Sequence, residues 1–391
     1  MSRSRRVGVA GLALGAVAAP VSVDRLPVSR AVRRQARLAL DAAGPYGSLR
    51  GTPGTAVAED GTGLYFETDE IDAAADGPAR PADDKAGGPV PRPVDVPPVD
   101  VPAPAVTVVF SHGYCLHQDV WHFQRAALRG VVRAVYWDQR SHGRSRRGRA
   151  QRESGRPVTI EELGRDLKAV LDAAVPEGPV VLVGHSMGGM TMMALAEQFP
   201  AYVAERVAGA AFLSTSAGNL ADVTYGFPAP AVRAVRRVLP DVLRLLGSRP
   251  GLVDLGRRAA GDLYAGLVRR YSFGAPGDVD PGVTRFAERL IESVPVDVVA
   301  EFYPAFGPHD KARALAAFGG PAAPPVLVLA GERDEITPAA HSERIAAALP
   351  GAELALLPGA GHLVLLEAPH EVNERLARLL ARSIQSHEPA L

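Results

Sequence analysis

Ser186 lies in the pattern Gly184-His-Ser-Met-Gly188, directly after an apolar run at residues 180–183 and before a helix-forming stretch. Glycine on both sides of the serine removes side chains that would clash in a sharp turn from strand to helix, and such a turn exposes the serine hydroxyl above the strand end. The unpaired backbone N–H groups at the start of the following helix can stabilise negative charge beside that hydroxyl. We therefore predict that Ser186 is a nucleophile, with Gly184 and Gly188 as the glycines of the turn.

A serine hydroxyl is a poor nucleophile at neutral pH, so a base must take its proton and an acid must orient that base. Asp334 follows an apolar run at residues 326–329, and His362 lies in a glycine-rich loop after another apolar run at residues 352–357. Loops at the carboxyl ends of strands are where open α/β sheets carry their chemistry. We predict that Asp334 is the acid and His362 the base.

One other loop could hold the acid, the loop that follows the apolar run at residues 207–213. It reads Ser-Thr-Ser-Ala-Gly-Asn at residues 214–219 and contains no carboxylate, which favours Asp334. Glu332 and Glu335 lie close to Asp334 in the sequence, and we expect both to be solvated.

Negative charge that develops on a carbonyl oxygen needs hydrogen-bond donors already in place. An apolar run ends at His112-Gly113-Tyr114, where the backbone N–H of Tyr114 would be presented toward the nucleophile. Together with the N–H of Met187 it would form an oxyanion hole, in which one donor typically contributes about 10²–10³ in rate. We expect His112 itself to be structural.

The elements that must position these residues follow a regular alternation. Apolar runs rich in β-branched residues alternate with helical stretches from about residue 105 to 213 and again from 325 to 383. Such strands are buried on both faces by helices, which predicts an α/β fold with a mostly parallel, doubly wound sheet. A mainly helical stretch at residues 219–318 interrupts the alternation and predicts a helical cap, while Asp60-Gly61 predicts a hairpin turn near the start.

Two stretches lie outside this alternation. Prolines recur through residues 76–104 and interrupt helix and sheet hydrogen bonding, so we expect a disordered or polyproline-like insert there.

At the N-terminus a basic start precedes an apolar run at residues 7–23, which is the arrangement of a signal peptide, with Ala16-Val-Ala18 as a cleavage site. Arginines at residues 25–37 disfavour translocation. The segment can be a membrane anchor, a cleaved signal peptide or a cytoplasmic extension. We expect a membrane-associated or exported protein, with a cytoplasmic protein as the alternative.

Composition narrows the possible classes. Lys plus Arg and Asp plus Glu each number 43, so the net charge gives no sign of a nucleic-acid partner. Cys115 is the only cysteine, which excludes a disulfide within the chain and argues against a cysteine-based zinc site. We expect no cofactor and no metal, and we interpret Cys115 as a small buried residue at a strand end.

The strand end before Tyr114, the turn around Ser186 and the loops of Asp334 and His362, taken in this order, resemble the α/β-hydrolase superfamily. The chain is most similar to the esterase, lipase and cofactor-free haloperoxidase-type branch with a helical lid. The resemblance implies that Ser186, Asp334 and His362 act as nucleophile, acid and base, that the N–H groups of Tyr114 and Met187 are the oxyanion donors, and that the helical insert is the lid.

The resemblance runs from about residue 57 to 382 and divides the chain. We expect an N-terminal apolar segment and basic arm at 1–50, the first part of the hydrolase core at 51–218 including the insert at 76–104, the cap at 219–318 and the second part of the core at 319–391.

The resemblance implies a serine hydrolase that cleaves carboxylic esters, thioesters or lactones through an acyl-enzyme, with a small-molecule ester as its partner. Haloalkane dehalogenases and epoxide hydrolases of the superfamily carry Asp at the position of Ser186 and are excluded. The aromatic and aliphatic residues of the insert favour small to medium apolar acyl groups, and we expect its arginines to be solvated. The alternatives are an acyltransferase or cofactor-free perhydrolase, and, in another class, a non-catalytic hydrolase-like binding protein.

Overall fold

The computed structural model describes residues 46–71, 106–224, 229–247, 261–320 and 323–386. The apolar run and basic arm predicted at residues 7–37 and the proline-rich insert predicted at residues 76–104 lie outside the described residues.

Eight strands form one sheet in the order β1-β2-β4-β3-β5-β6-β7-β8. Only β2 runs against its neighbours, since its pairs with β1 and β4 are antiparallel and every other pair in the sheet is parallel. The mostly parallel sheet predicted from the sequence is thereby confirmed. The strands are β1 Thr52–Val57, β2 Gly63–Asp69, β3 Thr107–Ser111, β4 Arg133–Trp137, β5 Val180–His185, β6 Val207–Leu213, β7 Val326–Gly331 and β8 Glu353–Leu357.

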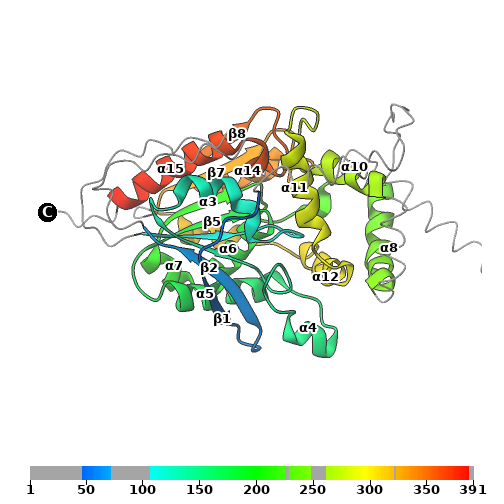
Figure 1. Ribbon diagram of the computed structural model, residues 1–391, viewed down its shortest axis with the longest axis horizontal. Helices are drawn as coiled ribbons and strands as arrows, with labels where there is room; N and C mark the ends of the chain where they lie inside the picture. The colour runs from blue at the N-terminus through cyan, green and yellow to red at the C-terminus, as the bar shows by residue number, and fades with distance from the viewer. Residues whose placement is uncertain (1–45, 72–105, 225–228, 248–260, 321–322, 387–391) are drawn as a thin grey trace, which may run out of the picture.

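Helices cover both faces of the sheet because the central strands carry apolar side chains in both directions. In β5, Val181 and Val183 face one core cluster and Val180 and Leu182 the other. Figure 1 shows α3 (His122–Leu128) and α15 (Pro369–Gln385) on one side, and α5 (Ile160–Ala174), α6 (Met187–Gln198) and α7 (Pro200–Arg206) on the other. The remaining helices of the core are α4 (Arg149–Ser154), α13 (Ala339–Ala348) and α14 (Val364–Glu367).

The predicted hairpin joins β1 and β2, which pair from Thr52–Thr68 to Val57–Gly63. Gly61 has φ 80°, and the Asp60 carboxylate accepts a hydrogen bond of 3.1 Å from the N–H of Thr62. Glycine tolerates this left-handed backbone, and an aspartate before it commonly closes the turn.

The four α-helices that the structure describes between β6 and β7 gather at one end of the molecule, as Figure 1 shows. They are α8 (Ala229–Gly247), α10 (Gly261–Ser272), α11 (Pro281–Glu292) and α12 (Val296–Phe302), followed by the short 3₁₀ helices η3 (Tyr303–Phe306) and η4 (Ala312–Phe318). We refer to α8, α10, α11 and α12 as the cap helices. In η4, Phe318 is buried and packs edge-on against Phe212 of β6, with 5.3 Å between ring centroids, so this last turn packs on the sheet.

The arginines at residues 144–152 lie on a loop and on α4, which begins at Arg149. Most of them are exposed, whereas the Arg147 guanidinium pairs with Glu301 of α12. Among the residues with described structure, every helix is too short or too polar to cross a membrane.

Candidate active site

Ser186 occupies the turn between β5 and α6 with φ 52° and ψ −119°, a backbone conformation that residues with a Cβ rarely adopt. Its N–H donates to the carbonyl of Leu213 at 2.9 Å, and its own carbonyl accepts from the Thr215 hydroxyl at 2.6 Å. Leu213 is the last residue of β6, and Thr215 lies in the loop directly after it. The neighbouring strand and the loop after it therefore hold the strained turn from two sides.

The two predicted turn glycines lie where no side chain fits. A Cβ on Gly188 would be 2.0 Å from the carbonyl oxygen of Ser111, at the end of β3. A Cβ on Gly184 would be 2.5 Å from the sulfur of Met192 and 2.6 Å from the carbonyl carbon of Gly188. Helix α6 can therefore start this close to β3 and β5 only with glycine at these two positions.

The structure brings together the three side chains predicted to be nucleophile, base and acid. The Nε2 of His362 lies 3.0 Å from the hydroxyl oxygen of Ser186, and the Nδ1 of His362 lies 2.9 Å from the Oδ2 of Asp334. All three residues are buried: the exposed fraction of the surface is 7% for Ser186, 6% for His362 and 3% for Asp334. An imidazole held between a hydroxyl and a carboxylate in this way can accept the hydroxyl proton at Nε2.

Asp334 is fixed in the ionised form. Its burial raises the pKa of the carboxyl, but the charge of His362 and the hydrogen bonds from His362 and Thr337 outweigh burial and bring the pKa below its ordinary value. One oxygen accepts the N–H groups of Ile336 and Thr337 at 2.8 and 2.9 Å, and the other accepts the Thr337 hydroxyl at 2.8 Å. These bonds leave Oδ2 directed at His362.

The backbone near the two predicted oxyanion donors also lies beside Ser186. A Cβ on Gly113 would be 3.1 Å from the Cβ of Ser186, and Tyr114 follows directly. The N–H groups of Tyr114 and Met187 donate no hydrogen bond to any part of the chain that the structure describes. They have the positions in the chain that an oxyanion hole requires, and that role stays a prediction.

The Tyr114 side chain reaches the cap helices. Its hydroxyl donates to the carbonyl of Val299 in α12 at 2.5 Å, and its ring stacks on Phe302 at 6.3 Å between centroids. The residue next to it, Cys115, is only half-buried and has φ 59°, so it lies in a strained turn beyond the strand and not buried at its end. Burial of the thiol raises the pKa of Cys115 to about 12, which keeps it protonated.

His112 has the structural role that we expected. Its Nε2 accepts the N–H of Gln139 at 2.9 Å, so Nδ1 carries the proton and donates to the carbonyl of Gly113 at 2.8 Å. Burial, followed by the charge of His142, holds the pKa of His112 well below its ordinary value. A neutral imidazole therefore braces the strand end that leads to Tyr114.

Several residues of the site were not found by reasoning from the sequence. His185, Thr215, Thr337 and Glu367 each hold part of the backbone or side chains around Ser186, Asp334 or His362. Gln139 joins the two predicted oxyanion segments, because its amide donates to the carbonyl of His112 at 2.5 Å and its oxygen accepts the Thr191 hydroxyl of α6 at 3.0 Å. Of these, only His185 lies inside a recognisable motif.

Glu335 differs from the expectation of a solvated side chain. Its carboxylate pairs with Arg270 of α10 at 2.6 Å and is one third exposed, so it connects the acid loop to a cap helix. The ion pair is partly screened by water and contributes little to stability.

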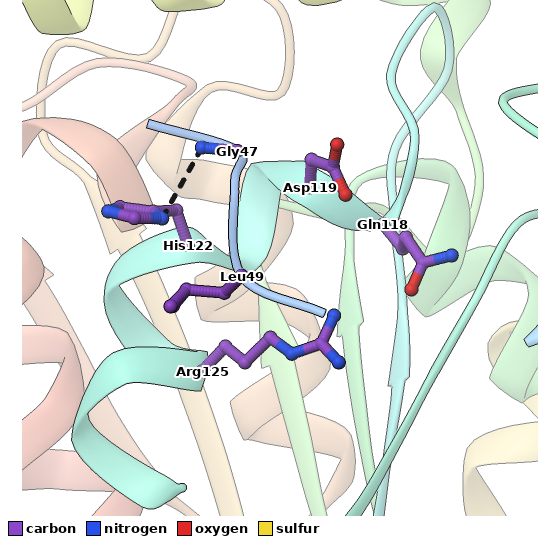
Figure 2. A pocket seen from close by; sticks show the side chains of 6 residues that line it. All are labelled: Gly47, Leu49, Gln118, Asp119, His122 and Arg125. Atoms are coloured by element: carbon purple, nitrogen blue, oxygen red, sulfur yellow. Dashed lines mark hydrogen bonds between the residues drawn. The ribbon is translucent and has the colours of Figure 1, made fainter. Parts of the chain in front are cut away.

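The small hollow in Figure 2 is a different place. It is a shallow surface feature lined by Gly47, Leu49, Gln118, Asp119, His122 and Arg125. Several of its polar groups bind one another or near neighbours: the N–H of Gly47 donates to His122 at 3.3 Å, and Arg125 donates to Asp69 at 2.7 Å. We interpret it as the seam where the first described residues pack on α3.

Comparison with known proteins agrees with the fold. A sequence profile described as the alpha/beta hydrolase family matches residues 108–375. An uncharacterised protein of Mycobacterium tuberculosis is 28% identical over 295 residues, which cover 73% of this chain and 77% of that protein. The monoacylglycerol lipase of Mycolicibacterium smegmatis is 26% identical over 280 residues, covering 68% of this chain and 83% of the lipase. A thermophilic esterase from Thermogutta terrifontis is similar in fold, with a TM-score of 0.59 at 21% identity over 86% of this chain and 99% of the esterase.

Proposed function

The chain belongs to the α/β-hydrolase family, and on that premise we propose that it is a serine hydrolase that cleaves carboxylic esters through an acyl-enzyme on Ser186. The observation that carries this proposal is the continuous hydrogen-bonded series from the Ser186 hydroxyl through His362 to Asp334. Ester hydrolysis is the activity of the esterase and of the lipase to which the chain is similar.

In the proposed reaction, the oxygen of Ser186 attacks the ester carbonyl while its proton passes to Nε2 of His362. The bond to the alcohol then breaks, and His362 returns the proton to the leaving oxygen. A water molecule next attacks the acyl group, giving one proton to His362, and the acid leaves as Ser186 recovers that proton. Asp334 stabilises the imidazolium in both halves, and the N–H groups of Tyr114 and Met187 would bind the carbonyl oxygen.

We propose small to medium apolar acyl groups as the preferred substrates. Support comes from the cluster around Met187 and Met190, in which Val298 and Phe302 of the cap are buried and Tyr114 is partly buried. The arginines described at the end of α10 also support this, because Arg269 and Arg270 are about half exposed and pair with Glu288 and Glu335. Their charge is neutralised by carboxylates of the chain itself.

The test compares kcat/KM for butyrate, octanoate and palmitate esters with that for a hemisuccinate ester, using Ser186→Ala as the blank. We expect a neutral ester to be the best substrate and the hemisuccinate to be poor. A hemisuccinate rate above all three neutral esters would place positive charge in the acyl site. Adding an acceptor alcohol or peroxide to the same assay separates hydrolysis from acyl transfer and perhydrolysis, and the absence of any turnover would point to a binding protein.

Attachment to a membrane or export is a separate proposal that rests on the sequence alone. It is supported by the basic start and the apolar run at residues 7–23. We expect the full chain to fractionate with membranes or to be exported, and a chain that lacks residues 1–30 to be active without either. An uncleaved full chain found wholly in the cytoplasmic fraction would contradict this proposal.

A further inference from the structure

The carboxylate of Glu367 joins two segments that are far apart in the chain. At the end of α14 it accepts the N–H of Gly361 at 2.6 Å, that of Gly274 at 3.1 Å and that of Ala275 at 3.0 Å. Gly361 directly precedes His362, whereas Gly274 and Ala275 lie two and three residues after the end of the cap helix α10. A carboxylate that accepts three backbone N–H groups forms charge-assisted bonds, which are shorter and stronger than neutral ones.

The two segments also touch backbone to backbone. A Cβ on Gly361 would be 2.4 Å from the backbone nitrogen of Gly274, and a Cβ on Gly274 would be 2.3 Å from the carbonyl oxygen of Gly359. The N–H of Leu363 donates to the carbonyl of Ser272 at 2.8 Å. Close packing opposes movement of the two segments toward each other, and the hydrogen bonds oppose their separation, so we expect a shift of residues 272–275 to move the loop of His362.

His362 therefore depends on Glu367 for the placement of its backbone. On one side Gly361 is bound by Glu367, and on the other Leu363 is bound by Ser272. Asp334 fixes the ring orientation, but it cannot by itself fix the distance from Nε2 to the Ser186 hydroxyl. Misplacement of a reacting group by about 1 Å can cost about 10²-fold in rate.

We propose, resting on the base role proposed above for His362, that Glu367 is a positioning residue for His362 and that through it the end of α10 sets the distance from the imidazole to Ser186. A shift of α10 then changes the rate of acyl transfer. Glu367 touches no reacting atom and acts only through the loop.

The main variant is Glu367→Gln. Its amide nitrogen is a donor, so it cannot accept a hydrogen bond from the backbone N–H that the carboxylate oxygen bound. We expect kcat to fall by roughly 10- to 100-fold with little change in KM. Labelling of Ser186 by a fluorophosphonate should slow by a similar factor. Glu374→Gln is the matched control, because Glu374 is exposed on α15 one helix further on. A merely structural role would lower the melting temperature and leave the rate of the folded enzyme unchanged.

A second variant keeps the carboxylate of Glu367 and displaces the backbone at residue 274, to which that carboxylate binds. Gly274→Ala forces its Cβ against the backbone at Gly359, while Gly277→Ala, in the same connection, meets nothing within 4 Å. We expect Gly274→Ala to reproduce the fall in kcat and Gly277→Ala to have no effect. Because both changes act on one link, the double variant Glu367→Gln with Gly274→Ala should lose less than the product of the single losses.

The outcomes separate the two proposals. Wild-type turnover and labelling in folded Glu367→Gln or in folded Gly274→Ala would overturn the positioning role while leaving Ser186 and His362 as proposed. Multiplicative losses in the double variant would overturn the shared link. A wild-type protein that neither hydrolyses esters nor labels at Ser186 would overturn the proposed function, and the positioning role with it.

Discussion

The imidazole of His185 binds the backbone carbonyl of His362, with 2.9 Å between Nε2 and the oxygen. Burial, followed by the charge of His362, lowers the pKa of His185 to about 3, so the ring is neutral. Because a carbonyl can only accept, Nε2 carries the proton and Nδ1 is bare. That bare nitrogen finds no partner among the described residues. The residue just before the predicted nucleophile therefore also holds the predicted base.

We expect the loss of this donor to slow turnover. His185→Leu leaves the carbonyl of His362 without a partner, whereas His185→Gln keeps an N–H that can replace Nε2. An unpaired buried carbonyl costs about 1–3 kcal/mol, which a loop can relieve only by moving. Steady-state rates of the folded variants should show a fall of about tenfold or more for His185→Leu and a smaller one for His185→Gln. Equal rates in both variants would argue against the positioning role of the bond.

The backbone strain at Ser186 should appear in stability. Ser186→Gly and Ser186→Ala both remove the hydroxyl, but only glycine adopts φ 52° without a steric cost. We expect Ser186→Gly to be more stable than Ser186→Ala by about 1 kcal/mol, measured by denaturant unfolding. An alanine variant of equal or higher stability would mean that the turn is not strained in solution.

The acid at residue 334 can be distinguished from its neighbour at 335. Asp334→Asn removes the charge that stabilises the imidazolium of His362, and we expect turnover to fall by orders of magnitude with little change in melting temperature. Glu335→Gln breaks only a half-exposed ion pair with Arg270, so kcat should change by less than about twofold. The reverse order of the two effects would move the acid.

His142 should make the protein less stable in acid. Burial lowers the pKa of His142 from 6.5 to about 4. Between these values the unfolded chain binds a proton that the folded protein does not, so stability is lost as the pH falls from 6.5 toward 4, by at most about 1.4 kcal/mol per pH unit. His142→Asn keeps a donor for the carbonyl of Arg140 and removes the titration. Unfolding free energies measured across this range should fall less steeply in the variant; parallel curves would contradict the low pKa.

Local sequence patterns were enough to predict the sheet and the candidate site residues. The parallel strands of the sheet coincide with apolar runs, whereas β1 was indicated only by the hairpin turn at Asp60-Gly61. The turn around Ser186 is marked by glycines that the packing of α6 requires. Asp334 and His362 could be proposed because a parallel sheet brings its carboxyl ends to one edge. Helix α7 begins at Pro200, because proline is well tolerated in the first turn of a helix.

Contacts between distant segments carry no such local signal. His185 and the carbonyl of His362 are 177 residues apart, and the Tyr114 hydroxyl and its acceptor in α12 are 185 apart. Glu367 reads as an ordinary helical glutamate, and only the tertiary fold shows that its carboxylate holds two loops. Sequence patterns therefore do not reveal residues that support a site by binding the backbone of other residues.

The most direct measurement of the central claim is the site of covalent modification by a fluorophosphonate, read by peptide mass mapping alongside the loss of ester hydrolysis. We expect one adduct per chain, on Ser186, formed in proportion to the activity lost, and no adduct in Ser186→Ala or in a chain unfolded beforehand. An adduct on a different serine, or ester turnover that continues after Ser186 is fully modified, would contradict the assignment of Ser186 as the nucleophile.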